Sequence, residues 1–138
     1  MIVAGLGCRR GCAREDVVGA LEAALARSGR ALAEIEALYA PTFKADEAVL
    51  SEVAYQLSKP LILLVPDVME ACAALALTHS ERVTAYTGLS SVAETAALAG
   101  ARALAGSPDV TLLGPRIAVG GATCALATAA VRDKEKLS

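Results

Sequence analysis

Hydrophobic residues in the first two thirds of the chain follow two alternating patterns. Short, nearly continuous apolar runs are typical of strands in a sheet covered on both faces, whereas apolar residues spaced three and four apart are typical of helices that pack by one side. The two patterns alternate along the chain, which is the order of parallel βαβ units. We expect strands at residues 2–6, 37–43, 61–65 and 83–86.

Capping residues and apolar spacing predict helices between these strands. Asp67 with Glu70, and Ser91 with Glu94, have the spacing of a capping box, in which side chains satisfy free N–H groups of the first turn. Gly29 is suited to end the first helix in the left-handed conformation. The expected helices cover residues 14–28, a segment capped by Asp46 that ends before Pro60, a segment beginning at Asp67, and residues 91–105.

The last third of the chain has a different pattern. Residues 110–119 and 122–129 read as strands that flank Gly120 and Gly121, a dipeptide typical of a tight antiparallel turn. Together with the βα segments, this predicts an α/β fold, a three-layer α/β/α sandwich on a mixed, mostly parallel sheet with a C-terminal antiparallel hairpin. We expect one domain over residues 1–131 and a charged tail at 132–138.

Size and charge narrow the range of partners. A chain of 138 residues is long enough to bury one hydrophobic core. Its net charge of -2 and 3% aromatic content provide neither a basic field nor stacking surfaces, which argues against nucleic acid. The longest strongly apolar run is far shorter than the roughly 18 residues that span a membrane, and the N-terminal run is too short for a signal peptide. We therefore expect a cytoplasmic protein without membrane or nucleic-acid partners.

The cysteines do not match a metal or redox motif. Cys8 and Cys12 have a C-x3-C spacing, and the single histidine, His79, is remote from them in sequence. Because we expect no signal peptide, we expect all four cysteines to be reduced thiols, and Cys72 and Cys124, set among alanines, to be small core residues. The sequence therefore predicts neither a metal site nor a cofactor.

The loop after the first strand is the most unusual segment. In an open parallel sheet, ligands bind outside the carboxyl ends of the strands. There the sequence GLGCRRGC places Arg9 and Arg10 between Gly7 and Gly11, just before a helix whose free N–H groups and dipole favour an anion. The loop is not a dinucleotide fingerprint, because Arg10 stands where the third glycine belongs. Taken alone, it is also compatible with a glycine-rich turn carrying two solvated arginines.

Two further loops are expected at the same edge of the sheet. After the second strand, Lys44 is predicted to face the crevice, while Asp46 and Glu47 either cap the helix and complement its dipole or act as general acid and base. After the fourth strand, Gly88 permits close approach of the backbone and Ser90 supplies a free hydroxyl. Like charges gathered at one edge favour an anionic ligand.

Taken in order, these segments resemble a known family. GLGCRRG, then K-x-D-E, then G-x-x-x-V-x-E-x-A-A-L and a final T-x-A-x-A strand are similar to the CobE/CbiG C-terminal domain family of cobalamin biosynthesis. The resemblance covers nearly the whole chain and is nearest to the free-standing CobE-type members, since we expect no further region ahead of the first strand. It implies that the family crevice is lined or framed by Gly5, Gly7, Cys8, Arg9, Arg10, Gly11, Lys44, Asp46, Glu47, Gly88, Glu94 and Thr123.

The sequence departs from the family pattern at two places. Members often have Ser or Thr directly after the first loop, whereas Cys12 and Ala13 stand here. A lysine commonly precedes the last strand pair, whereas this chain has Gly114, Pro115 and Arg116, of which the last keeps the positive charge.

The resemblance implies that the ligand is an acidic corrin-ring precursor. Such precursors carry acetate and propionate groups around an apolar ring, and guanidinium groups with helix N–H groups suit carboxylates. The expected ligand-binding residues are Gly7, Cys8, Arg9, Arg10, Gly11, Lys44, Gly88, Ser90 and Arg116.

Three functions are compatible with this interpretation. The leading hypothesis is an accessory protein that binds a corrinoid intermediate or product and carries it between pathway enzymes. The enzyme alternative is a CbiG-like hydrolase that opens the ring-A lactone with loss of acetaldehyde, in which Glu47 or Asp46 activates water and Arg9 or Arg10 stabilises the oxyanion. The third is a subunit that only docks onto another cobalamin-pathway enzyme.

Overall fold

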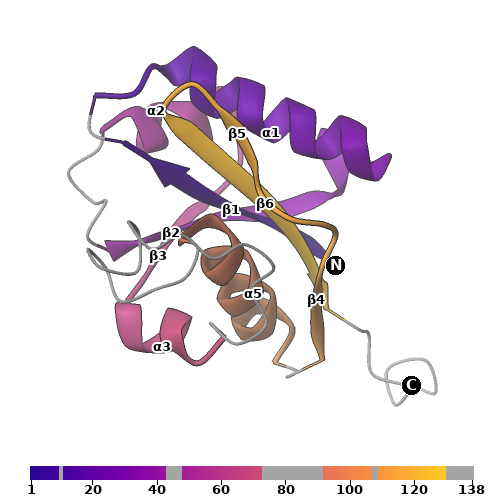
Figure 1. The fold of residues 1–138 in the computed structure, drawn as a ribbon. Coiled ribbons are helices and arrows are strands. Elements are labelled where there is room, and N and C mark those ends of the chain that lie inside the picture. Colours follow the sequence, from indigo (N-terminus) through magenta and orange to yellow (C-terminus); the bar gives the residue numbers. More distant parts are fainter. Residues whose placement is uncertain (10, 43–47, 73–91, 107–108, 130–138) are drawn as a thin grey trace.

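A computed structural model describes residues 1–9, 11–42, 48–72, 92–106 and 109–129 (Figure 1). The strand expected at residues 83–86 and the charged tail lie outside the described residues. The described elements are β1 (Ile2–Cys8), α1 (Arg14–Ser28), the 3-10 helix η1 (Leu32–Glu34), β2 (Ile35–Pro41), α2 (Ala48–Leu57), β3 (Leu61–Leu64), α3 (Pro66–Glu70), α5 (Val92–Ala105), β4 (Val110–Leu112), β5 (Ile117–Val119) and β6 (Ala122–Ala129).

The strands form one sheet in the order β3-β2-β1-β6-β4, and β5 also pairs with β6. β1 pairs in parallel with β2, and β2 with β3, while β6 is antiparallel to β1, β4 and β5. Within the described sheet, every strand except β6 therefore runs in the same direction. This confirms the predicted mixed, mostly parallel sheet with an antiparallel hairpin at the C-terminal end.

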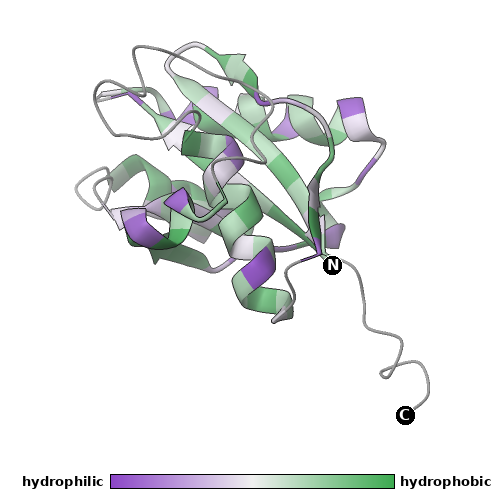
Figure 2. Cartoon of the chain, turned by 60° about the horizontal axis from the view of Figure 1, so that its bottom comes forward, coloured by the Kyte–Doolittle hydropathy of each residue, from purple (hydrophilic) through white to green (hydrophobic). Residues whose placement is uncertain are grey.

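Helices cover both faces of the sheet, so the three-layer α/β/α arrangement is also confirmed (Figure 1). The alternation of side chains along β1 explains the layers, because Ala4 and Leu6 pack in the core with α1 and α2, whereas Val3 packs in the core with α3 and α5. Figure 2 shows hydrophobic residues along most of the strands. The strands are thus apolar on both sides, which is why they read as continuous apolar runs in the sequence.

Helix α5 lies unusually close to the sheet. A Cβ atom at Gly5 of β1 would collide with the backbone of Ala93 and Ala97, and one at Gly100 would collide with the ring of Tyr39 on β2. The helix is buried without interruption from Ala93 to Ala101. Its small residues and these two glycines therefore allow the helix backbone to approach the strand backbone, and the first turn of α5 comes to lie beside β1.

Two sequence predictions about local structure were wrong. The strand expected at 110–119 is divided into β4 and β5, because Gly114 adopts φ 117° and Pro115 has no N–H to donate to a ladder. Asp67 does not cap α3: the N-cap is Val65 and Pro66 is the first residue of the helix, a position to which its fixed φ is suited. Gly29 ends α1 in the left-handed conformation, as predicted.

Candidate functional site

The carboxyl end of β1 is held by the hairpin of β5 and β6. In the antiparallel ladder Gly7 lies opposite Thr123 and Cys8 opposite Ala122, so β1 extends two residues beyond the predicted end. A Cβ atom at Gly7 would collide with the Thr123 hydroxyl oxygen. Just beyond the strand, the Arg9 N–H donates to the carbonyl oxygen of Gly121 at 2.8 Å. We call the segment between β1 and α1, residues 9–13, the arginine loop. Its start is therefore held against the hairpin turn by the backbone hydrogen bond of Arg9.

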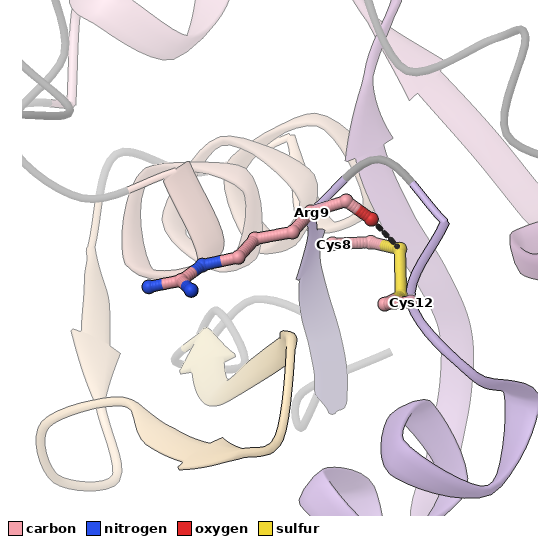
Figure 3. Close-up of a disulfide and its surroundings, with 3 residues drawn as sticks. All are labelled: Cys8, Arg9 and Cys12. Atoms are coloured by element: carbon pink, nitrogen blue, oxygen red, sulfur yellow. Dashed lines mark hydrogen bonds between the residues drawn. A yellow bond between two sulfur atoms is a disulfide. The ribbon is translucent and has the colours of Figure 1, made fainter.

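Cys8 and Cys12 are joined by a disulfide across this loop (Figure 3). The prediction that they are reduced thiols was therefore wrong. It rested on the redox state of cellular compartments and took no account of Gly11, whose φ of 76° turns the chain so that the two Cα atoms lie 6.2 Å apart. The turn is closed by the Cys12 N–H, which donates to the Arg9 carbonyl oxygen at 3.0 Å.

The other two cysteines are buried free thiols, as predicted. Cys72 and Cys124 are each about 1% exposed or less, and both belong to the hydrophobic core. Burial raises the pKa of the Cys124 thiol to about 12. Because the thiolate is the reactive form, Cys124 is inert at neutral pH.

The disulfide packs directly against the hairpin turn. A Cβ atom at Gly121 would lie 2.9 Å from the Cβ atom of Cys12, and one at Gly120 would collide with the Asp16 carboxylate in the first turn of α1. Gly120 also adopts φ 57°, which favours glycine. The arginine loop, the disulfide, the hairpin turn and the start of α1 thus form one closely packed unit.

Arg9 projects from this unit. Figure 3 shows its guanidinium group extending away from the disulfide, and the residue is exposed to solvent. Among the described residues, no carboxylate forms an ion pair with it. The N-cap of α1 is Ala13, which offers no side-chain acceptor, while Glu15 and Asp16 in the first turn already complement the helix dipole. The positive charge at this described edge therefore comes from the Arg9 side chain, while the acidic first turn of α1 offsets the positive end of the helix dipole.

Glu94 connects α5 to the segment ahead of β5. Its side chain is fully buried in the first turn of α5, and its Oε2 accepts a hydrogen bond of 2.9 Å from the Arg116 N–H. The sequence predicted a capping box with Ser91, which lies outside the described residues, and the resemblance placed Glu94 at the family crevice but did not indicate its partner. Residue pairs 22 apart in sequence carry no local pattern, so this link was missed. It places the backbone of Arg116 beside the first turn of α5.

The structure brings only part of the predicted site together. Gly7 and Cys8 are the last two residues of β1, Arg9 and Gly11 lie in the loop that follows, and Thr123 lies opposite Gly7. In the described part of the chain, no group of three His, Cys, Asp or Glu side chains is placed to hold a metal ion, and no helix is long and apolar enough to cross a membrane. The predicted site residues outside the described ranges are Arg10, Lys44, Asp46, Glu47, Gly88 and Ser90.

The chain is similar to proteins of a known family. The family described as Cobalamin synthesis G C-terminus matches residues 2–127. Protein CobE of a Sinorhizobium species is 34% identical over 135 residues, which cover 98% of this chain and 84% of that protein.

Two solved structures support the same assignment. The crystal structure of CobE, a protein from the cobalamin (vitamin B12) biosynthetic pathway, matches with a TM-score of 0.89 and 39% identity over 96% of this chain and 92% of that one. The cobalamin biosynthesis protein chiG from Agrobacterium tumefaciens matches with a TM-score of 0.72 and 35% identity over 94% and 99%.

The class defined by these observations is a three-layer α/β domain with an arginine loop at the carboxyl end of its first strand. The chain belongs to the CobE/CbiG C-terminal domain family and is a cobalamin biosynthesis protein.

Reduction of the disulfide is expected to lower stability only moderately. Closing so short a loop removes little entropy from the unfolded chain, which corresponds to at most about 2 kcal/mol. The rest of the fold does not depend on the bond, since β1 is held on both sides by β2 and β6. In a thermal melt followed by circular dichroism, a dithiol reductant should lower the melting temperature by roughly 10 °C or less and leave the folded spectrum unchanged. Loss of the folded spectrum in reductant would contradict this.

Proposed function

We propose that the protein binds an acidic corrinoid intermediate or product of the cobalamin pathway in the crevice at the carboxyl end of β1, and carries it without changing it. The observation that supports this most directly is the exposed Arg9 on a loop that the hairpin and the disulfide hold in place. A guanidinium group on a restrained backbone loses less freedom when it binds a carboxylate than one on a mobile loop, so more of the contact energy becomes affinity.

Several positive charges are needed for this function, because each exposed contact with a carboxylate is weak. Arg9 and Arg116 are the described candidates, and Arg10 and Lys44 are the candidates outside the described residues. The family membership supports a corrinoid as the anion, since the matched proteins belong to cobalamin biosynthesis. The cytoplasm is the compartment that fits such a carrier.

Salt is expected to weaken binding. The proposed contacts are exposed charges, and raising the ionic strength from 0.1 M to 1 M shortens the screening distance from about 10 Å to about 3 Å. The dissociation constant for a corrin with free acetate and propionate groups should therefore rise severalfold over this range, as measured by a titration of the visible absorbance. Affinity that does not depend on salt would indicate that the apolar ring face, and not the carboxylates, is recognised.

Release of acetaldehyde distinguishes the carrier from the hydrolase alternative. If the protein is a carrier, incubation with a lactone-containing corrin precursor should release no acetaldehyde. The Glu47→Gln variant should bind the corrinoid as the wild type does, because the substitution keeps the size of the side chain and removes only its charge and its basicity. The comparison uses an enzyme-coupled assay for acetaldehyde. If the wild type alone releases acetaldehyde and Glu47→Gln abolishes the release, the protein is a hydrolase with Glu47 as its base.

A further inference from the structure

The Cys8–Cys12 disulfide encloses Arg9, the described side chain best placed to meet an anion. The two cysteines differ in solvent exposure. Cys8 is 6% exposed at the end of β1, whereas Cys12 is half-buried between the exposed residues Gly11 and Ala13. A small thiol, or a dithiol on another protein, therefore reaches the bond from the Cys12 side.

The position of the bond argues against a purely structural role. It joins residues four apart, so it links no separate elements of the core and constrains only the loop. Disulfides of proteins in a reducing compartment are usually transient and act in catalysis or redox sensing. In the cytoplasm proposed above, this bond would be made and broken during the life of the protein.

The loop depends on the bond through specific contacts. Arg9 donates its N–H to Gly121 and accepts from the N–H of Cys12, and Cys12 packs against Gly121. Breaking the bond releases Cys12 from Cys8, and the turn at Gly11 loses its covalent restraint. Among the described residues, Cys12 then keeps its hydrogen bond to Arg9 and its packing against Gly121. The backbone that carries the Arg9 guanidinium consequently becomes less ordered.

We propose that Cys8 and Cys12 form a reversible thiol–disulfide site that sets the order of the Arg9 loop and, through it, the affinity for the carboxylate ligand. The reductant is a dithiol. One of its thiolates attacks Cys12 Sγ, forming a mixed disulfide and releasing Cys8 as a thiolate, and its second thiol then displaces Cys12. Two electrons and two protons pass from the dithiol, which becomes a cyclic or internal disulfide, to the two cysteines.

The ligand part of this inference rests on the proposed function, so the experiment measures the loop separately. The protein is compared without reductant, with dithiothreitol, and as the Cys12→Ser variant, which keeps a small polar side chain and cannot form the bond. Alkylation by iodoacetamide in denaturant, after excess dithiothreitol has been removed, counts all free thiols. Hydrogen exchange at the Arg9 and Cys12 amides of the native protein reports the order of the loop. A corrin with free acetate and propionate groups serves as the binding probe.

The inference predicts that dithiothreitol adds two alkylated cysteines, accelerates exchange at both amides, and weakens corrin binding by about three- to tenfold, since the loop must then be ordered on binding. Cys12→Ser should match the reduced wild type in amide exchange and in affinity for the corrin, and dithiothreitol should change neither. Equal affinity of the two redox forms would overturn the ligand switch and leave the proposed function intact.

Other outcomes separate the two ideas further. If neither form binds the corrin, the proposed function is wrong. In that case amide exchange still tests the redox site: exchange that does not change on reduction would overturn it, and accelerated exchange would support it. If mild oxidation by oxidised glutathione leaves both loop thiols open to alkylation, no disulfide forms and the inference is wrong.

Discussion

Replacing Gly5 by Ala is expected to lower the free energy of unfolding by about 3 kcal/mol or more, because overpacking a tight core typically costs 1–3 kcal/mol and backbone atoms cannot move aside as side chains can. The added Cβ atom would collide with the backbone of Ala93 and Ala97, and it would lie 2.9 Å from the Ala97 side chain. Helix α5 must therefore shift away from β1. Urea unfolding followed by circular dichroism measures the change.

Gly19→Ala provides the matched control. A Cβ atom at Gly19, within α1, would meet only the Val119 side chain at 3.4 Å, which is an ordinary contact. Because Ala favours a helix over Gly by up to about 1 kcal/mol, this variant should be neutral or slightly more stable than the wild type. Equal destabilisation by the two variants would show that α5 does not lie as close to β1 as described here.

Replacing Arg9 and Arg10 together by Ala is expected to weaken corrinoid binding about tenfold, which corresponds to about 1.4 kcal/mol. Each exposed guanidinium contact contributes less than about 1 kcal/mol, so both must be removed for a clear effect. Stability should change little, because Gly7 and Gly11 and the backbone hydrogen bonds of the loop are kept. The dissociation constant and the melting temperature are measured on the same samples.

Arg102→Ala is the control for a general loss of positive charge. Arg102 is exposed in the last turn of α5, at the opposite end of that helix from the candidate site. Its replacement should leave the dissociation constant unchanged. A similar loss of affinity in both variants would mean that the net charge of the protein, and not the loop, attracts the ligand.

Much of the fold could be predicted because each layer has a local pattern. The apolar runs of β1 and β3 and the span of α1 agree with the sequence to within a few residues, since these segments are buried by neighbours of the expected kind. Gly114 and Pro115 mark the break between β4 and β5, but the segments on both sides of them have the composition of strands. The sequence therefore reads as one continuous strand.

The site was less predictable, because its contacts join residues that are distant in sequence. The arginine loop was found from its composition alone. Its attachment to Gly121 and the link between Glu94 and Arg116 depend on the pairing of β1 with β6, which no local pattern encodes. The disulfide depends on the left-handed turn at Gly11, which brings Cys8 and Cys12 together, and the C-x3-C spacing alone does not show that this turn forms.

Direct titration of the oxidised wild-type protein measures whether it recognises an acidic corrinoid. Two ligands are compared at low ionic strength: a corrin with free acetate and propionate groups, and the same corrin with these groups amidated. We expect a saturable shift of the visible absorbance band with one equivalent of the acid, and much weaker binding of the amide. No shift with the acid, or equal affinity for both corrins, would contradict it.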